Sequence, residues 1–305
     1  MQINDVCVIG MGPAGVTAAI YLKRFGFEPI CFEPMMVGGK VNVTYEIQNY
    51  PGFMGMGPEL AMKLEEQVKF NEIKIVRKSV KKVEKVDSVY KVVAGQEEYY
   101  FKAVIIATGL KEKEYKVPGE DKYQARGISR CAVCDGPLYR NKPVAVLGGG
   151  NSAVEECAYL ATICSKVTLI HRRDEFRAQE SSVNLMTSNG VNIYKPYGLV
   201  SFVKDGNKAK GIVIKHNVDG SEITLNFDSI IVNYGTVTSA SNFAIEETNR
   251  AYNVDRTFRT SFENVFAVGN SCYYEGKVKN ITCGLGEAVI AITEIDRIVH
   301  PGKNI

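Results

Sequence analysis

The sequence predicts an α/β protein with two three-layer domains, one inserted into the other. Its 305 residues exceed the length at which one hydrophobic core usually stops growing, so we expect two domains. An apolar strand, a glycine-rich turn and a helical pattern follow one another twice in the chain. Each copy has a later apolar strand of its own, and one more strand near the C-terminus completes the first copy. This order places the second copy inside the first.

The first copy begins at the N-terminus with DVCVIGMGPAG (5–15), an apolar strand that ends in Gly10-x-Gly12-x-x-Gly15. The helical pattern VTAAIYLKRFG follows it. Glycines in this arrangement let the backbone approach a pyrophosphate at the N-terminus of the helix. Glu33 stands 23 residues beyond Gly10, at the end of the next strand, where a carboxylate accepts hydrogen bonds from ribose hydroxyls. The first site therefore fits an adenosine without a 2′-phosphate, such as that of FAD.

The second copy repeats the design in PVAVLGGGNSA (143–153). Its strand ends in Gly148-x-Gly150-x-x-Ala153, and the helical pattern VEECAYLATI follows. One such glycine pattern is weak evidence, because it also occurs as a tight turn without a ligand. Two copies, each between a strand and a helix, indicate two Rossmann-like dinucleotide-binding domains.

The end of the next strand distinguishes the two nucleotides. His171 stands 23 residues beyond Gly148, where the first copy has an acid, and Arg172, Arg173 and Arg177 follow it. Guanidinium groups bind a 2′-phosphate through paired hydrogen bonds, whereas a carboxylate would repel it. The alternative is a solvated basic loop. The position at the end of the strand favours phosphate binding, so the second site fits NADPH.

The later strands set the domain boundaries. AVIIATG (103–109) belongs to the first copy and SIIVNYG (229–235) to the second, whereas NVFAVGN (264–270) precedes the helical segment ITCGLGEAVIAITEI. We expect linkers near Lys113–Tyr115 and Ser239–Ser241. The predicted FAD-binding domain comprises residues 1–113 and 242–305, and the predicted NADPH-binding domain comprises residues 114–241.

Two cysteines lie close together in CAVCDG (131–136), at Cys131 and Cys134. Such a pair can be a redox disulfide, half of a zinc site or an accident of composition. Zinc normally takes four ligands, but the chain has no second close pair and only three histidines, without ligand spacing, so we expect no metal. A disulfide that lies near a flavin and a nicotinamide can accept two electrons and yield a reactive thiolate. The pattern therefore favours a redox disulfide.

Asp135 follows the second cysteine and has two interpretations. Its carboxyl group could protonate a departing thiolate. It could equally form an Asx-type turn before Gly136. The residue types and their spacing leave both interpretations open.

Composition and charge exclude several classes of protein. The chain is 45% apolar and 23% charged, with a net charge of +3, which is typical of a soluble globular protein and too small to indicate a nucleic-acid or membrane partner. No apolar run approaches the ~20 residues that span a bilayer. The start, MQINDVCVIG, lacks the basic region of a signal peptide, so we expect a cytoplasmic protein. We expect several of the other cysteines to be small buried hydrophobes.

Further short segments occur beside the glycine turns and the cysteine pair. They are GMGPAG (10–15), the GGK that follows Glu33, IQNYPG (47–52), ATG (107–109), GISRCAVCDG (127–136), GGGNSAVEE (148–156) and HRRDEFRA (171–178). With these segments the chain resembles the low-molecular-weight thioredoxin reductases of the bacterial type over nearly its whole length. Their order is specific, above all CAVCDG directly ahead of GGGNSA.

The resemblance implies a homodimeric NADPH-dependent oxidoreductase with tightly bound FAD. Electrons would pass from NADPH to the flavin, then to the Cys131–Cys134 disulfide, and then to thioredoxin or a thioredoxin-like dithiol protein. The resemblance gives Cys134 as the thiol that faces the flavin, Cys131 as the thiol that attacks thioredoxin, and Asp135 as the acid. It also implies an NADPH domain that alternates between two orientations.

The glycine motifs and the resemblance together give the cofactor-binding residues. For FAD they are Gly10, Gly12, Pro13, Ala14, Gly15, Glu33, Gly38, Gly39, Lys40, Asn49, Ala107, Thr108, Gly109, Gly269, Asn270, Lys279, Asn280 and Ile281. For NADPH they are Gly148, Gly150, Asn151, Ser152, Ala153, Glu155, His171, Arg172, Arg173, Arg177 and Gly235.

The C-terminal third departs from this family. Thioredoxin reductases usually have GD after the last FAD strand and an Arg-Gln-Ala stretch, whereas this chain has Gly269-Asn270 and then SCYYEGKVKNITCGLGEA (271–288). That segment, with DSIIVNYGTVTS (228–239), is more similar to the thioredoxin-reductase-like ferredoxin–NADP reductases, which lack the cysteine pair. A ferredoxin/flavodoxin–NADP reductase-type electron-transfer flavoenzyme is therefore the alternative. A second alternative is a non-catalytic redox sensor. The sequence favours a thioredoxin-disulfide reductase.

Overall fold

The computed structural model describes residues 2–113, 117–238, 247–248 and 251–300 of the chain. These residues belong to two compact units: unit 1 comprises residues 1–42, 46–111 and 237–305, and unit 2 comprises residues 43–45 and 112–236. The chain passes between the units through β9 (Leu110–Glu112) and β18 (Thr236–Thr238), which pair with each other. Most of the predicted linker Lys113–Tyr115 and all of Ser239–Ser241 lie outside the described residues.

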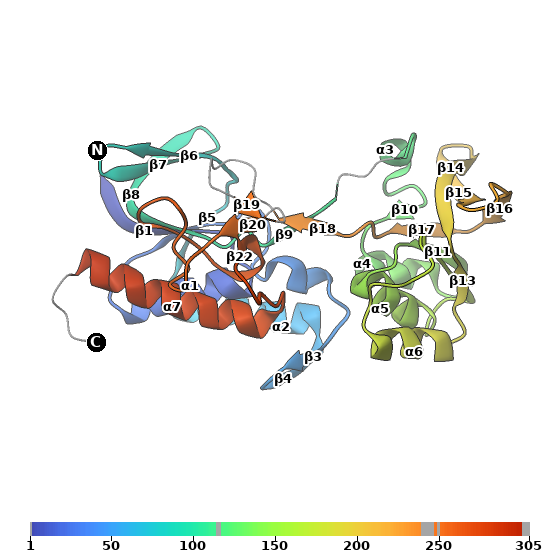
Figure 1. Ribbon diagram of the computed structural model, residues 1–305, viewed down its shortest axis with the longest axis horizontal. Coiled ribbons are helices and arrows are strands. Elements are labelled where there is room, and N and C mark those ends of the chain that lie inside the picture. Colours follow the sequence, from blue (N-terminus) through green and yellow to red (C-terminus); the bar gives the residue numbers. More distant parts are fainter. Residues whose placement is uncertain (1, 114–116, 239–246, 249–250, 301–305) are drawn as a thin grey trace. The chain divides into compact units, whose positions relative to one another are not determined.

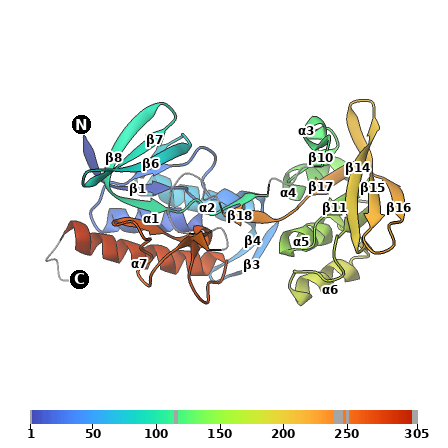
Figure 2. The ribbon, with the colours of Figure 1, turned by 45° about the horizontal axis from the view of Figure 1, so that its top comes forward.

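Unit 1 is built on a seven-stranded sheet in the order β5-β2-β1-β8-β7-β6, and β21 also pairs with β8. Strands β5, β2, β1, β8 and β21 run parallel to one another. Strand β7 pairs antiparallel with β8 and with β6. Helices α1 and α7 lie side by side in both views (Figure 1 and Figure 2). The bounds are β1 (Ile3–Ile9), α1 (Pro13–Arg24), β2 (Ile30–Phe32), α2 (Gly57–Phe70), β5 (Lys74–Val76), β6 (Val80–Val86), β7 (Val89–Ala94), β8 (Glu97–Ile106), β21 (Val265–Ala267) and α7 (Ile281–Val299).

Unit 2 has three layers around a five-stranded parallel sheet in the order β10-β17-β11-β12-β13. One face packs on α5 and α6, and the other packs on the antiparallel sheet β14-β15-β16, which Figure 2 shows beside β11 and β17. The bounds are α3 (Glu120–Tyr123), β10 (Ile128–Ser129), α4 (Ala132–Asp135), β11 (Pro143–Leu147), α5 (Asn151–Leu160), β12 (Lys166–Ile170), α6 (Glu180–Ser188), β13 (Asn192–Tyr194), β14 (Tyr197–Asp205), β15 (Lys208–His216), β16 (Glu222–Asn226) and β17 (Ser229–Val232).

Smaller elements complete the described chain. Two short sheets accompany unit 1, β3-β4 and β19-β20-β22. No helix within the described ranges is long and apolar enough to cross a membrane. The bounds are η1 (Gly39–Val43), β3 (Glu46–Tyr50), β4 (Phe53–Met56), η2 (Gly136–Tyr139), β19 (Glu247–Thr248), β20 (Ala251–Asn253), η3 (Gly269–Ser271) and β22 (Cys272–Tyr273).

The central strands are buried on both faces, which explains their continuous apolar runs. In β1 and β8 the side chains of Val6, Val8, Val104 and Ile105 have no exposed surface. The expected burial of cysteines is confirmed at four positions, whereas Cys164 and Cys283 are only half-buried. The four buried residues are Cys7, Cys31, Cys157 and Cys272. Burial raises the pKa of each of these four thiols, so they stay protonated and unreactive at neutral pH.

Gly127 provides a test of the packing in unit 2. It has φ +97°, and a Cβ atom there would lie 2.1 Å from the carbonyl oxygen of Ala209. Gly127→Ala should therefore destabilise the full chain by about 2 kcal/mol or more, through strain and a backbone clash. Gly206→Ala is the matched control, because Gly206 also has positive φ (+58°) but no heavy atom within 4 Å among the described residues. Thermal unfolding of both variants measures the difference, and equal losses would contradict this account of Gly127.

Candidate cofactor and redox sites

The carboxyl ends of four parallel strands meet at one edge of the unit 1 sheet. Strands β1, β2, β8 and β21 end there, and each is followed by a residue that the sequence predicts to bind a nucleotide. These residues are Gly10, Glu33, Thr108 and Asn270. Such an edge is where open α/β sheets bind ligands. The sheet therefore brings together four segments that are far apart in the sequence.

The first glycine turn is tightly packed at two glycines and open at the third. A Cβ atom on Gly10 would lie 2.5 Å from the carbonyl oxygen of Ala107, and one on Gly15 would lie 1.9 Å from that of Gly10. Gly12 precedes α1 in an extended conformation, and no described heavy atom lies within 4 Å of its Cβ position. The first N–H groups of a helix have no partner within it. The turn thus forms an open cradle of backbone donors that suits a pyrophosphate.

Glu33 is buried at the end of β2, and backbone N–H groups hold its carboxylate. One oxygen accepts a hydrogen bond from the N–H of Met11 at 2.9 Å, and the other accepts one from Met35 at 2.9 Å. A carboxylate has about four lone-pair sites, so each oxygen keeps capacity for a ribose hydroxyl. The geometry fixes the group beside the glycine turn and leaves it able to bind an adenosine ribose.

Two polar atoms at this edge are buried without a hydrogen-bond partner in the described part of the chain: Thr108 Oγ1 and Asn270 Oδ1. They follow β8 and β21, which are adjacent strands. Buried polar atoms are normally paired, and an unpaired atom lowers stability. A polar ligand at this edge would satisfy both atoms, so the residues present fit FAD.

A carboxylate outside the predicted set of site residues organises the turn after β21. Glu287 lies on α7 and accepts hydrogen bonds from the N–H of Gly269 and the hydroxyl of Tyr274, both at 2.8 Å. It also pairs with the ammonium of Lys277, and the two side chains are 3% and 2% exposed. The thiol of Cys272 lies 3.4 Å from the same carboxylate, and burial, followed by the charge of Glu287, raises its pKa to about 12. Glu287 therefore fixes the segment that presents Asn270.

The sequence does contain one signal for Glu287. It is the only charged residue in the otherwise apolar stretch ITCGLGEAVIAI (281–292). A charge on the buried face of a helix needs a partner of opposite sign. The identity of that partner, Lys277, depends on how the preceding loop folds back.

Helix α7 approaches the glycine turn through small residues. Asn280 caps the helix by accepting a hydrogen bond from the N–H of Cys283 at 2.8 Å, which confirms the predicted start of this helix. A Cβ atom on Gly284 would lie 3.1 Å from Cα of Gly269 and 3.5 Å from Cβ of Ala14. Any larger residue at position 284 would push the helix away from the turn.

Of the other residues predicted to bind FAD, some lie against the first glycine turn and others are exposed. The N–H of Gly38 donates to the carbonyl of Met11 at 2.8 Å, so the Gly38–Gly39 segment lies against the first turn. Lys40 and Lys279 are exposed. Asn49 is exposed on β3, in the separate β3-β4 hairpin and not at the edge of the main sheet.

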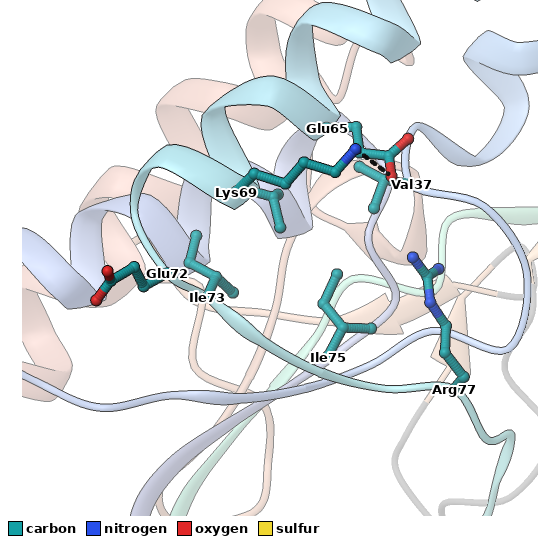
Figure 3. Close-up of a pocket in the computed structure, with 8 residues that line it drawn as sticks. Val37, Glu65, Lys69, Glu72, Ile73, Ile75 and Arg77 are labelled. Carbon is teal, nitrogen blue, oxygen red and sulfur yellow. Dashed lines mark ion pairs between the residues drawn. The ribbon is translucent and has the colours of Figure 1, made fainter.

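A cavity of about 260 Å³ lies between the C-terminal half of α2 and the edge strand β5 (Figure 3). Four of its eight lining residues are apolar and four are charged, and the charged groups include an ion pair between Glu65 and Lys69 at 3.3 Å. Two acidic and two basic side chains balance each other, so the cavity does not favour an anion, and we assign it no part in nucleotide binding. Its lining residues are Val37, Glu65, Val68, Lys69, Glu72, Ile73, Ile75 and Arg77.

Unit 2 has a second edge of the same kind. Its five strands are parallel, so β10, β11, β12 and β17 all end on one side. The cysteine pair follows β10, and the second glycine turn follows β11. Only β17 separates these two strands, which places them about 10 Å apart. The sheet thus brings the redox pair and the predicted nucleotide turn to one edge.

The second glycine turn has the geometry of the first. A Cβ atom on Gly148 would lie 2.4 Å from the carbonyl oxygen of Asn233 and 2.7 Å from Cβ of Ala153. Gly150 precedes α5 in an extended conformation, with open space at its Cβ position. Ser152 and Glu155 are exposed on α5, and Gly235 follows β17 with φ +89°. The residues present fit a second pyrophosphate.

The arginine loop is the segment 171–179, which follows β12. Arg172, Arg173 and Arg177 are exposed, and within the described residues their guanidinium groups have no hydrogen bond or ion pair. His171 has a different environment, because it is buried and stacks on Phe176 at 5.4 Å. Burial, together with the nearby arginine charges, lowers the pKa of His171. The three arginines are therefore free to bind an anion, whereas His171 packs neutral within the loop.

Cys131 and Cys134 form a disulfide with a Cα–Cα distance of 5.3 Å. Cys134 is exposed and Cys131 is half-buried. The hydroxyl of Ser129 donates to the carboxylate of Asp135 at 2.6 Å and accepts from the N–H of Cys131 at 3.1 Å. This is the one side-chain hydrogen bond of Asp135 in the described chain. The carboxylate is thus joined to the redox segment and not to the turn that follows.

An ion pair between a buried carboxylate and a half-buried arginine anchors the residue before the disulfide. Glu120 on α3 is 1% exposed and pairs with Arg130. Its second oxygen accepts a hydrogen bond from the N–H of Val117 at 3.3 Å. The pair ties the start of α3 to the redox segment, and sequence spacing alone did not reveal it.

Comparisons with known proteins agree with this geometry. The model of a family described as pyridine nucleotide-disulphide oxidoreductase matches residues 4–293. A thioredoxin reductase of Ureaplasma parvum is 35% identical over 95% of both chains. A glucosaminate ammonia-lyase of Pseudomonas fluorescens is 37% identical over 88% of this chain and 87% of its own. The crystal structure of Lactococcus lactis thioredoxin reductase matches with a TM-score of 0.91 at 34% identity, over 97% of this chain and 99% of that one.

The buried Lys277–Glu287 pair provides a test of unit 1. Glu287→Gln should lower the stability of the full chain by about 3 kcal/mol, because it leaves the ammonium of Lys277 buried without a counter-charge. The double variant Lys277→Met/Glu287→Gln should recover part of this loss. Glu294→Gln is the control: Glu294 lies on the same helix as Glu287, and its ion pair with Arg259 is partly exposed, so it should contribute less than about 1 kcal/mol. Thermal unfolding measures all three, together with the single Lys277→Met variant, and simple additivity of the two single losses in the double variant would contradict the coupling.

Proposed function

The chain belongs to the family of pyridine nucleotide-disulphide oxidoreductases, and we propose that it is an NADPH-dependent thioredoxin reductase that contains FAD. Membership of this family implies both cofactors. The observation that carries the proposal is the Cys131–Cys134 disulfide, which follows the edge strand of the sheet that also carries the second glycine turn. A protein that reduces disulfides needs such a pair close to its electron donor.

We assign FAD binding to residues 1–113 and 242–305. The N–H groups at the start of α1 would hold the pyrophosphate, and Glu33 would hold the adenosine ribose. Thr108 and Asn270 would hydrogen-bond polar groups of the cofactor, since each has a buried unpaired oxygen. The neutral amide of Asn270 avoids the repulsion that an aspartate would have with a pyrophosphate. The full set is the one that the sequence predicts.

We assign NADPH binding to residues 114–241. The turn at Gly150 would hold the pyrophosphate, and the guanidinium groups of Arg172, Arg173 and Arg177 would hold the 2′-phosphate. Bidentate pairing with phosphate suits three exposed arginines that lack other partners in the described chain. His171 would shape the loop without binding the phosphate itself.

The disulfide would then carry out the exchange chemistry. FAD, when bound, supplies a carrier that takes a hydride from NADPH and gives two electrons to a disulfide. Two electrons would break the Cys131–Cys134 bond and leave one thiolate and one thiol, and Asp135 would supply the proton of the thiol. The Cys131 thiolate would attack the substrate disulfide, which releases the first substrate sulfur as a thiolate and forms a mixed disulfide. Cys134 then attacks Cys131, which releases the second substrate thiol and restores the pair.

Two other functions fit less well. A ferredoxin/flavodoxin–NADP reductase would have no role for the Cys131–Cys134 disulfide, although the C-terminal segment resembles that class. Elimination of ammonia, which the name of the Pseudomonas fluorescens relative indicates, is not a net redox reaction and gives no role to the disulfide or the arginine loop. We therefore propose thioredoxin, or a thioredoxin-like dithiol protein, as the substrate. We also propose a homodimer that works in the cytoplasm.

The direct test uses the purified flavoprotein under anaerobic conditions. NADPH should bleach the bound flavin in stopped-flow measurements, and NADPH with the host's thioredoxin should release thiols. Reduced ferredoxin and glucosaminate serve as the comparison substrates. Bleaching by ferredoxin but not by NADPH, or ammonia release without thiol release, would overturn the assignment.

The arginine loop predicts the choice of coenzyme. Arg172→Ala/Arg173→Ala should weaken NADPH much more than NADH, because only NADPH has a 2′-phosphate. Each charge-assisted contact contributes roughly 1.5–3 kcal/mol, so the pair should change the NADPH/NADH preference about a hundredfold or more. The measurement is kcat/KM for both coenzymes. An equal loss for both would mean that these arginines do not bind the phosphate.

The two cysteines should differ when they are replaced one at a time. If Cys134 is the thiol that reacts with the flavin, as the resemblance implies, Cys131→Ser should give a free Cys134 thiolate and a long-wavelength charge-transfer band with the oxidised flavin. Cys134→Ser should lack this band, and neither variant should reduce thioredoxin. Absorption spectra of the two oxidised variants make the comparison. A band only in Cys134→Ser would reverse the roles of the two thiols.

A further inference from the structure

The arginine loop is held in shape by residues that lie outside its own motif. Two of these contacts come from separate turns of unit 2. The ammonium of Lys195 donates to the carbonyl of Asp174 at 2.7 Å, and the side-chain amide of Asn217 donates to the carbonyl of Arg172 at 2.7 Å. Lys195 follows β13 and Asn217 follows β15. Neither residue belongs to the glycine turn or to HRRDEFR.

These two donors are themselves fixed by the backbone. The N–H of Tyr197 donates to the carbonyl of His171 at 2.9 Å, which holds the turn 194–197 against the start of the loop. The N–H of Asn217 donates to the carbonyl of Pro196 at 2.9 Å, which joins the second turn to the first. The ammonium of Lys195 also lies 5.3 Å from the ring centroid of Phe176, a cation–π contact. The two turns therefore form one frame beside the loop.

The glycine turn holds the other side of the loop. The N–H of Arg177 donates to the carbonyl of Gly149 at 2.8 Å, and the N–H of Gln179 donates to the side-chain oxygen of Asn151 at 2.8 Å. Inside the loop, Nε2 of His171 donates to the carbonyl of Glu175 at 3.0 Å. All of the hydrogen bonds to the loop described above use its backbone or its buried histidine. The arginine side chains stay available because the frame binds the backbone instead.

We propose that Lys195 and Asn217 are specificity-determining positioning residues, which hold the arginine loop in the shape that binds a 2′-phosphate. This inference rests on the proposed use of NADPH. An exposed loop that is already ordered loses less conformational entropy when its side chains bind a ligand. A nucleotide without a 2′-phosphate does not contact the arginines, so its affinity does not depend on whether the loop is ordered beforehand. Lys195 and Asn217 thus affect discrimination between the coenzymes and not general nucleotide binding.

The test is a titration of the FAD-loaded full chain with two probes. The first, 2′,5′-ADP, carries the additional phosphate, and the second, 5′-AMP, lacks it. Asn217→Ala and Lys195→Met should each weaken 2′,5′-ADP by about three- to tenfold, the effect of one lost hydrogen bond, and should leave 5′-AMP unchanged. Calorimetry gives the affinities, and thermal unfolding verifies that each variant is folded.

Three controls separate positioning from simple charge. Lys195→Arg keeps both a donor and a charge, so it should restore most of the affinity. Lys204→Met removes an exposed charge from β14 of the same unit and should leave both probes unchanged. Asn217→Ala changes no charge, so its effect should persist in high salt, which screens long-range attraction.

The outcomes distinguish this inference from the function on which it rests. If Arg172→Ala/Arg173→Ala abolishes the preference for 2′,5′-ADP but Asn217→Ala and Lys195→Met do not change it, the positioning role is wrong and NADPH use stands. Equal weakening of both probes by Asn217→Ala and Lys195→Met also overturns the positioning role. If the arginine variant itself leaves the preference intact, the assignment of NADPH to this loop fails.

Discussion

The two nucleotide sites depend on one constraint: the helix that follows a parallel strand begins with N–H groups that have no partner, at the carboxyl edge of the sheet. Both units expose these N–H groups in the same way. Gly10 and Gly148 let the turn pass close to a neighbouring strand, and Gly12 and Gly150 leave the helix N-terminus open. An anion at that position satisfies the donors, so the fold itself provides the reason for a phosphate ligand.

Two ion pairs, each with a buried carboxylate, fix segments at these edges. Glu287 holds the turn that presents Asn270, with Lys277 as its counter-ion, and Glu120 holds Arg130 beside the disulfide. A buried pair contributes little net stability, but the loss of one partner is strongly destabilising. Each pair therefore fixes a geometry and does not act as a general source of stability. In both units the fixed segment is one that the proposed chemistry uses.

The chemistry differs between the units because different groups follow equivalent strands. After the second strand of unit 1 comes the carboxylate of Glu33, which suits ribose hydroxyls. After β12, the corresponding strand of unit 2, comes the arginine loop, which suits a phosphate. The disulfide follows an additional edge strand, β10, that carries Cys131 to the same side as the second glycine turn. One sheet design thus accommodates two nucleotides and an exchange reaction.

The sequence by itself determined the two glycine turns, the cysteine pair, the arginine cluster and the start of the last helix at Asn280, because each depends on residues close together in the chain. Only the tertiary structure revealed the partners that lie far from one another. The pairing of Lys277 with Glu287, the contacts of Lys195 and Asn217 with the arginine loop, and the burial of His171 depend on how distant segments pack. A short motif specifies which donors and acceptors are present, whereas packing decides which of them meet and which remain free for a ligand.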